Sequence, residues 1–254
     1  MKINKKDLID FENKVVTEFK KGETYGPVHL SGGNEEPLLK IFKKVKPQDW
    51  VFSTHRSHYH ALLKSKDPKW LMNEIIVNAN SSHINSKKHK IFTSSIVGGI
   101  IPIALGVAMG IKMKQAQMEK DLKEIIKPMK GKDWKVVGKV KVFPKNLPHV
   151  WCFIGDMAVE MGCFAEADKY AINFNLPITF VVEDNALGCD TPTNIVWGEK
   201  EYPNKKIFNV RKDIKTIYYN YKRFYPHYGI GEWIIFAKDK KMRTKGDYVA
   251  EKIK

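Results

Sequence analysis

The chain has 254 residues and a formal net charge of +16. This length is enough for one large α/β domain with a full core, and we treat residues 1–254 as a single domain. Arginine occurs only at positions 56, 211, 223 and 243, and lysine, spread along the chain, supplies the rest of the positive charge. Because phosphate recognition favours the planar fork of arginine, we expect a lysine-rich solvated surface and not a nucleic-acid-binding one.

The sequence also indicates in which cellular compartment we expect the protein. The longest apolar stretch, residues 96–111, is interrupted by glycine and proline and is shorter than the roughly 20 residues of a membrane span. The first 16 residues lack the apolar region of a signal peptide. Cys152, Cys163 and Cys189 have no metal-binding spacing. We therefore expect a cytoplasmic protein with free thiols that binds no membrane.

The first half of the chain alternates between helical patterns and polar connections. Residues 5–21 are amphipathic and end at Gly22, and residues 34–46 follow the pair Gly32-Gly33. Asp67-Pro68 is a typical helix start. Residues 78–95 are polar and irregular, which suits an active-site loop. Residues 102–127 are predicted to be helical.

Residues 131–148 alternate between apolar and polar side chains, as a β-hairpin does. After them comes a strand, helix and strand. The apolar runs Val150–Ile154 and Ile178–Val182 are the two strands, and the helix between them has one apolar face with helical spacing. That face is made of Met161, Phe164, Ala167, Ala171 and Phe174.

A right-handed crossover of this kind predicts that the two strands are parallel. Asp156 and Asn185 follow the carboxyl ends of the two strands, where such units bind ligands. If the strands are neighbours, the two turns lie roughly 5–10 Å apart. A carboxylate and an amide oxygen at that separation suit a hard divalent cation such as magnesium, which commonly holds phosphate oxygens as well. Asp156 as a helix cap and Asn185 as a plain turn residue remain alternatives.

This pattern resembles the thiamine diphosphate signature, Gly-Asp-Gly followed about thirty residues later by Asn-Asn. Here it reads Gly155-Asp156-Met157 and Asp184-Asn185. The closest likeness is to the alpha chain of the decarboxylating component of 2-oxo acid dehydrogenases, of the pyruvate and branched-chain type. Three further segments match in the same order: His29-Leu30, residues 49–58, and residues 81–84 with 95–102. Residues 221–227 resemble a further segment of the family more weakly.

The resemblance implies a thiamine diphosphate-binding fold, an α/β fold with a mainly parallel sheet flanked by helices on both faces. It implies that Asp156, Asn185 and the Leu187 carbonyl hold Mg²⁺. The resemblance also implies that three other groups of residues bind the cofactor: the turn after the strand at 150–154, two residues at the end of the polar segment that begins at 78, and three basic residues. These are Gly155, Met157 and Ala158; Ser95 and Val97; and His55, Arg56 and His227.

The resemblance further implies catalysis on a 2-oxo acid, with His58, His83 and His227 transferring protons or binding the substrate carboxylate. Taken without it, each histidine is more often an ordinary surface or core residue, and Arg56 could pair with a surface carboxylate. Glu183 is interpreted as structural, and Met161, Phe164 and Phe174 are interpreted as core residues. In this family a carboxylate from a beta chain activates the cofactor's aminopyrimidine. We expect this chain to need such a pyrimidine-binding partner, in a heterotetramer, or to pair with a second copy of itself.

The chain departs from the family pattern at four places. Met157 replaces a glycine that lets the backbone approach the diphosphate, and His55 replaces a tyrosine. Residues 113–148 are interpreted as an insertion. Fewer residues separate Asn185 from Arg223 than the family spacing predicts, which indicates that one crossover helix is missing. Two other functions therefore stay open: a transketolase-like or carboligase half-enzyme, and a scaffold that has lost the cofactor.

Overall fold

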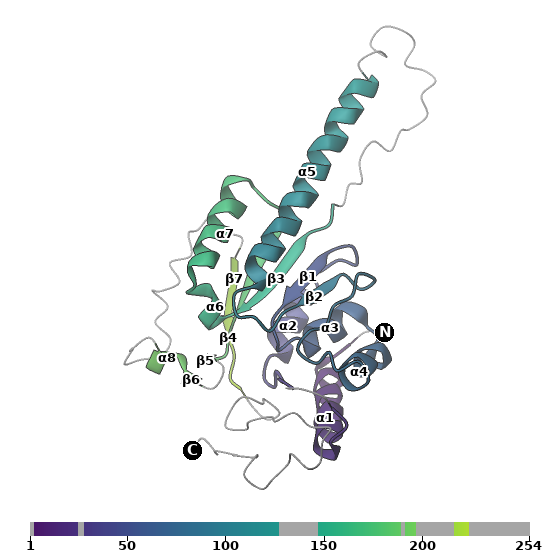
Figure 1. The fold of residues 1–254 in the computed structure, drawn as a ribbon, viewed down its shortest axis with the longest axis vertical. Coiled ribbons are helices and arrows are strands. Elements are labelled where there is room, and N and C mark those ends of the chain that lie inside the picture. The colour runs from purple at the N-terminus through teal and green to yellow at the C-terminus, as the bar shows by residue number, and fades with distance from the viewer. Residues whose placement is uncertain (1–2, 25–27, 127–146, 189–190, 197–215, 224–254) are drawn as a thin grey trace.

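A five-stranded parallel sheet with helices on both faces organises the computed structural model of the chain (Figure 1). The structure describes residues 3–24, 28–126, 147–188, 191–196 and 216–223. The strand order is β2-β1-β3-β4-β7, and every neighbouring pair is parallel. The strands are β1 (Trp50–Ser53), β2 (Ile91–Thr93), β3 (Val150–Gly155), β4 (Ile178–Asp184) and β7 (Thr216–Asn220).

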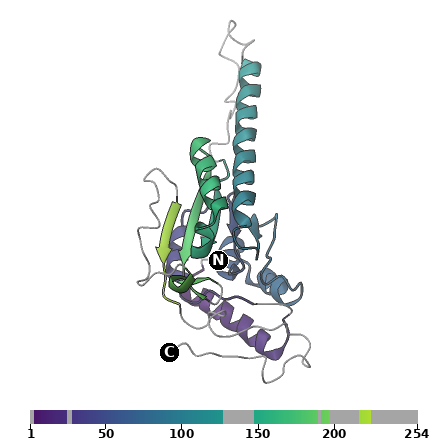
Figure 2. The same ribbon diagram turned by 60° about the vertical axis from the view of Figure 1, so that its left-hand side comes forward.

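Two layers of helices cover the sheet, and they come from different parts of the chain. The first layer contains α1 (Lys5–Lys21), α2 (Glu35–Phe42), α3 (His58–Ser65) and α4 (Pro68–Ile76). The second contains α5 (Ile100–Ile126), α6 (Asp156–Val159) and α7 (Gly162–Asn173). A small antiparallel pair, β5 (Leu187–Gly188) with β6 (Thr191–Pro192), and α8 (Thr193–Val196) follow β4. Figures 1 and 2 show α5 projecting well beyond the sheet.

Strand alternation divides the core into two halves. In β3, Val150, Cys152 and Ile154 pack with α5, α6 and α7, whereas Trp151 and Phe153 pack with the first four helices. Both sides of the central strands are therefore apolar, as is typical of parallel strands covered on both faces. This confirms the predicted α/β class with a mainly parallel sheet.

The strongest local signals in the sequence produce the predicted elements. Helix α1 spans Lys5–Lys21, begins with a capping box between Asn4 and Asp7, and ends where Gly22 adopts a left-handed φ of 86°. Asp67 caps α4 by accepting a hydrogen bond from the Trp70 amide at 3.0 Å. The predicted strands at 150–154 and 178–182 are present, parallel and adjacent, each slightly longer than expected.

Four predictions need correction. The irregular segment 78–95 contains the short strand β2, and the helix predicted at 34–46 ends at Phe42. The single helix expected after β3 is two helices, α6 and α7. Met161 and Phe174, which flank α7, are 38% and 48% exposed, so they are not core residues as interpreted. Ala167 is the buried residue of α7, and Phe164 and Ala171 pack at the edge of the core.

Several predictions fall on residues that the structure does not describe. The hairpin at 131–148 lies almost wholly outside the described residues. The first part of the proposed insertion, up to residue 126, continues α5. Most of the connection between β4 and β7 also lies outside, so the missing crossover helix stays a prediction. Within the described residues, no helix is both long and apolar enough to cross a membrane.

Asp49 ties the start of β1 to the start of β3. Its buried carboxylate accepts hydrogen bonds from the His149 amide at 2.9 Å, the Trp151 indole at 3.1 Å and the Lys46 amide at 2.9 Å. We expect Asp49→Ala to lower the free energy of unfolding by about 3 kcal/mol, because three donors lose a buried acceptor. Chemical denaturation measures this. Asp10→Ala, at a half-exposed position, should change it by less than about 0.5 kcal/mol; equal losses in both variants would contradict the assignment.

Candidate functional site

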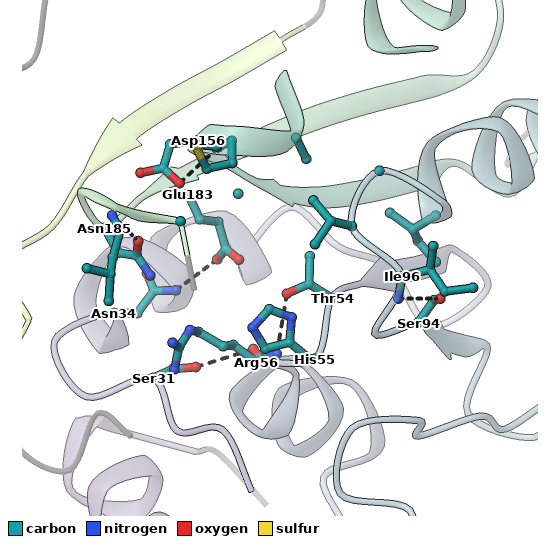
Figure 3. A pocket seen from close by; sticks show the side chains of 18 of the residues that line it. Ser31, Asn34, Thr54, His55, Arg56, Ser94, Ile96, Asp156, Glu183 and Asn185 are labelled. Atoms are coloured by element: carbon teal, nitrogen blue, oxygen red, sulfur yellow. Dashed lines mark hydrogen bonds between the residues drawn. The ribbon is translucent and has the colours of Figure 1, made fainter. Parts of the chain in front are cut away.

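A pocket opens where the carboxyl ends of the strands meet (Figure 3). Every strand of the sheet contributes to its wall, either by its last residues or by the loop that follows, and the loop before α2 completes it. The lining residues are Ser31, Asn34, Thr54, His55, Arg56, Ser94, Ile96, Val97, Gly98, Ile100, Gly155, Asp156, Met157, Ala158, Glu183, Asn185, Leu187, Gly188 and Tyr221. This is the position at which parallel α/β sheets bind ligands.

Asp156 is the first residue of α6 and lies in the pocket wall. It is 7% exposed. Its Oδ1 accepts a hydrogen bond from the Met157 amide at 3.0 Å, while its buried Oδ2 has no hydrogen-bond partner among the described residues. Burial, followed by the neighbouring acid Asp184, raises the pKa of Asp156 to about 7. The helix cap is Gly155, so the alternative of Asp156 as the cap is wrong.

The turn after β4 brings Asn185 and Leu187 to the same wall. Ala186 adopts a left-handed φ of 64°, an uncommon conformation for a residue other than glycine. Side-chain hydrogen bonds hold it: the Ala186 amide donates to Asp184 at 2.9 Å, and the Leu187 amide donates to the Asn185 Oδ1 at 3.0 Å. Asn185 therefore does act as a turn residue, and it also lines the pocket.

These residues fit a hard cation. An unsatisfied carboxylate oxygen, an amide oxygen and a turn of backbone carbonyls are the donors that magnesium takes from proteins. The unpartnered Oδ2 of Asp156 is the observation that decides this, because a buried carboxylate oxygen without a donor is costly unless a proton or a cation compensates it. No cluster of three or more acidic, histidine or cysteine side chains suited to a metal occurs among the described residues.

Arg56 and His55 form the opposite wall, in the loop after β1. Arg56 is 7% exposed, so it is not a surface arginine, and one guanidinium nitrogen donates to the Leu30 carbonyl at 2.9 Å. His55 packs edge-on against His29, with ring centroids 4.5 Å apart. Burial and then the Arg56 charge lower the pKa of His55 to about 3, so its ring is neutral and can donate one hydrogen bond.

Glu183 is a pocket residue that the sequence interpretation had treated as structural only. Its Oε1 accepts hydrogen bonds from Asn34 at 2.8 Å, His60 at 3.1 Å and the Tyr219 hydroxyl at 2.6 Å. Burial acts to raise its pKa, but these donors outweigh burial and the net shift is downward. The carboxylate therefore joins the loop before α2 to the ends of β4 and β7.

The three predicted catalytic histidines differ in position. His58 does not line the pocket: it is fully buried behind it, with Nε2 3.0 Å from the Ser81 hydroxyl and Nδ1 3.7 Å from Glu12. His83 is exposed and lies between two serine hydroxyls, 2.9 Å from that of Ser82 and 2.8 Å from that of Ser95. His227 lies outside the described residues.

Most of the predicted cofactor-binding residues converge on this pocket. His55, Arg56, Val97, residues 155–158, Asn185 and Leu187 all line it, while Ser95 lies beside the lining residues Ser94 and Ile96. Besides Glu183, the lining residues that the sequence interpretation missed are Ser31, Asn34, Thr54, Ser94, Ile96, Gly98, Ile100, Gly188 and Tyr221. Several of these follow strands directly, and that position was the available signal.

Met157, which stands where the family pattern has glycine, packs over Gly188. A Cβ added at Gly188 would lie 2.7 Å from the Met157 Cγ and 3.1 Å from its sulfur. The thioether side chain therefore occupies space that the absence of a side chain at Gly188 leaves open. Both residues line the pocket, so this contact shapes the wall beside Asp156.

Comparison with known proteins gives a consistent match. The profile of the family described as "Dehydrogenase E1 component" matches residues 4–205. The alpha subunit of acetoin:2,6-dichlorophenolindophenol oxidoreductase from Bacillus subtilis is 31% identical over 195 residues, which cover 73% of this chain and 50% of that protein. The alpha subunit of the pyruvate dehydrogenase E1 component from Porphyra purpurea is 31% identical over 186 residues, covering 69% and 47%. The chain thus spans about half the length of these curated relatives.

We expect Gly188→Ala to destabilise the chain by about 1–2 kcal/mol, because the new methyl group displaces Met157 from a packed wall. Met157→Ala in the same chain should restore most of that loss. A double-mutant cycle of denaturation free energies measures the coupling between the two positions. Purely additive effects would show that the contact between Met157 and Gly188 is not what constrains this turn.

Proposed function

We infer the function from one premise: the chain belongs to the dehydrogenase E1 component family. We propose that it is the alpha subunit of a thiamine diphosphate- and magnesium-dependent enzyme that decarboxylates a 2-oxo acid, either pyruvate or a branched-chain acid. The observation that carries the proposal is the unpartnered, buried Oδ2 of Asp156 beside Asn185, in a pocket at the carboxyl ends of the strands.

In this proposal Asp156, Asn185 and the Leu187 carbonyl hold magnesium. Arg56 donates to the diphosphate, and the neutral ring of His55 adds one more hydrogen bond. When bound, thiamine diphosphate supplies the nucleophile and the electron sink for the loss of carbon dioxide. The chain itself positions the cofactor and excludes water, and Ile96, Val97 and Met157 supply apolar wall for that purpose.

The loop after β2 is the proposed place for the organic part of the cofactor. Backbone carbonyls near Ser95 and Val97 are expected to hold the aminopyrimidine. His83, held between Ser82 and Ser95, is close to this loop and can hold or pass a proton near the reacting centre. His58 is fully buried, so we assign it a positioning role through Ser81.

A beta-type partner is part of the proposal. The relatives described above are alpha subunits by name, which implies a second kind of subunit. Large apolar side chains are exposed on the loop after β2 and on or beside the helices of the second layer, a pattern that marks association surfaces. They are Ile96, Val97, Ile103, Met113, Met161, Tyr170 and Phe174, of which Tyr170 and Phe174 stack at 5.8 Å. We propose that this face meets the pyrimidine-binding chain, in a heterotetramer.

A second substrate class is favoured by one observation. The acetoin oxidoreductase subunit is as similar to this chain as the pyruvate dehydrogenase subunit, at 31% identity each. Acetoin and a 2-oxo acid both contain a ketone, which lies next to a hydroxyl-bearing carbon in acetoin and next to a carboxylate in the acid. The same chain residues can therefore serve either reaction, and only the part of the pocket that contacts the leaving group distinguishes them.

The metal assignment predicts the behaviour of Asp156→Ala. This variant loses the charged ligand, so magnesium-dependent binding of thiamine diphosphate should weaken by about 100-fold or more. Isothermal titration with and without a chelator measures the effect. Glu166→Ala, which removes an exposed acid on α7, is the matched control and should bind normally. Unchanged cofactor affinity in Asp156→Ala would remove the basis of the proposal.

Arg56→Lys tests the diphosphate contact. Lysine keeps the charge but loses the planar two-pronged donor, so cofactor affinity should fall about tenfold while the melting temperature changes little. Calorimetry and thermal unfolding on the same sample separate binding from folding. If the melting temperature of the variant falls strongly while its cofactor affinity is unchanged, Arg56 is a structural residue whose role is to donate to the Leu30 carbonyl.

The partner assignment predicts that the purified chain alone has no decarboxylase activity and gains it with a beta-type chain. The prediction follows from the proposal that the carboxylate that activates the aminopyrimidine belongs to that partner. Reduction of 2,6-dichlorophenolindophenol with pyruvate, a branched 2-oxo acid or acetoin measures the activity and identifies the substrate. Turnover by the isolated chain at typical enzyme rates, above about 1 per second, would contradict the prediction.

A further inference from the structure

Two buried aspartates, Asp156 and Asp184, lie at the proposed cation site. The last residue pair between β3 and β4 is Gly155 with Glu183, so Asp156, the first residue of α6, follows beside Asp184, the last residue of β4. Asp184 is 1% exposed, and its carboxyl group lies close to that of Asp156. The Asn-Asn pattern of the family resemblance implies a neutral amide at this position, whereas this chain has an aspartate there.

We propose that Asp184 makes the site doubly charged, so that the chain holds a divalent cation before any diphosphate binds. The proposal deepens the proposed function, because it rests on the same cation site. Asp184 acts as a positioning residue that supplies charge, and Asp156 supplies the ligand. The order of binding is then cation first and thiamine diphosphate second.

The hydrogen bonds separate these two roles. Both oxygens of Asp184 are engaged, Oδ1 with the Ala186 amide at 2.9 Å and Oδ2 with the Tyr218 hydroxyl. In Asp156, Oδ1 accepts from the Met157 amide, whereas Oδ2 is buried without a donor in the described part of the chain. The open ligand position is therefore on Asp156, whereas both oxygens of Asp184 are already held by hydrogen bonds.

Charge matching explains the effect on binding. With a neutral residue at 184, one aspartate faces a cation of charge +2, and the anionic diphosphate must supply the remaining negative charge. With Asp184 the two aspartates together can balance the cation. Cation affinity rises with the negative charge of the site, and salt screens buried charges little.

The full-length chain can be tested without cofactor, with Mn²⁺ as the probe. Electron paramagnetic resonance of free Mn²⁺ at pH 8 gives the number of ions bound and the dissociation constant. We expect one Mn²⁺ per wild-type chain, displaced by Mg²⁺, and at least tenfold weaker binding in Asp184→Asn. This substitution keeps the side-chain shape and an acceptor oxygen. The matched control is Asp121→Asn, which removes an exposed acid on α5 and should bind like the wild type.

A second readout protects the test against a folding defect. Bound cation should raise the melting temperature of the wild-type chain without cofactor, and Asp184→Asn should lose most of that rise while retaining a native circular dichroism spectrum. If Asp184→Asn does not fold, the wild-type stoichiometry still decides, because a chain that binds no Mn²⁺ without thiamine diphosphate overturns the proposal. So does equal affinity in Asp184→Asn, or unchanged binding in Asp156→Ala.

Adding thiamine diphosphate afterwards separates this inference from the proposed function. If Mn²⁺ binds alone through Asp184 and thiamine diphosphate then fails to bind, the charged site stands and the cofactor assignment fails. If Mn²⁺ and thiamine diphosphate bind only together, the cofactor assignment stands and the role of Asp184 fails.

Discussion

The pairing of β3 with β4 is the constraint on which the pocket depends. Six residue pairs, from Val150 with Ile178 to Gly155 with Glu183, fix where both strands end. A shift of one residue would turn every side chain of one strand to the opposite face. It would also separate Asp156 from the turn that carries Asn185. Each strand packs different side chains into the two halves of the core, and the close fit of those side chains holds the register, so the core positions the site directly.

The sequence predicts this part of the molecule well, for a physical reason. Val150–Ile154 and Ile178–Val182 are uninterrupted apolar runs of strand length, and each is followed by a polar turn. Helix α1 is equally clear, because Asn4, Asp7 and Gly22 mark both of its ends. The cofactor-binding residues near the strand ends could be assigned from their positions because parallel strands present their carboxyl ends at one edge.

The remaining features depend on contacts that no local pattern records. Residues 91–93 are too short to stand out as a strand, and they become β2 only by pairing with β1. Met161 and Phe174 have helical spacing, but spacing does not reveal that no described segment covers them. Glu183 joins the pocket wall through Asn34, His60 and Tyr219, which are distant in sequence. Such long-range hydrogen bonds decide whether a carboxylate is merely structural or faces a ligand.

The backbone contact at Gly33 has a consequence for the order in which the chain folds during its synthesis. Its φ is +105°, and an added Cβ would lie 2.2 Å from the Lys222 carbonyl, so the loop before α2 and the segment after β7 touch backbone to backbone. The Tyr221 amide also donates to the Asp184 carbonyl at 3.0 Å. The ribosome therefore synthesises the loop that contains Gly33 long before the segment near residue 222 against which this loop packs. A nascent chain on the ribosome can form the α1–α4 layer early, but it completes this pocket only after β7 has emerged.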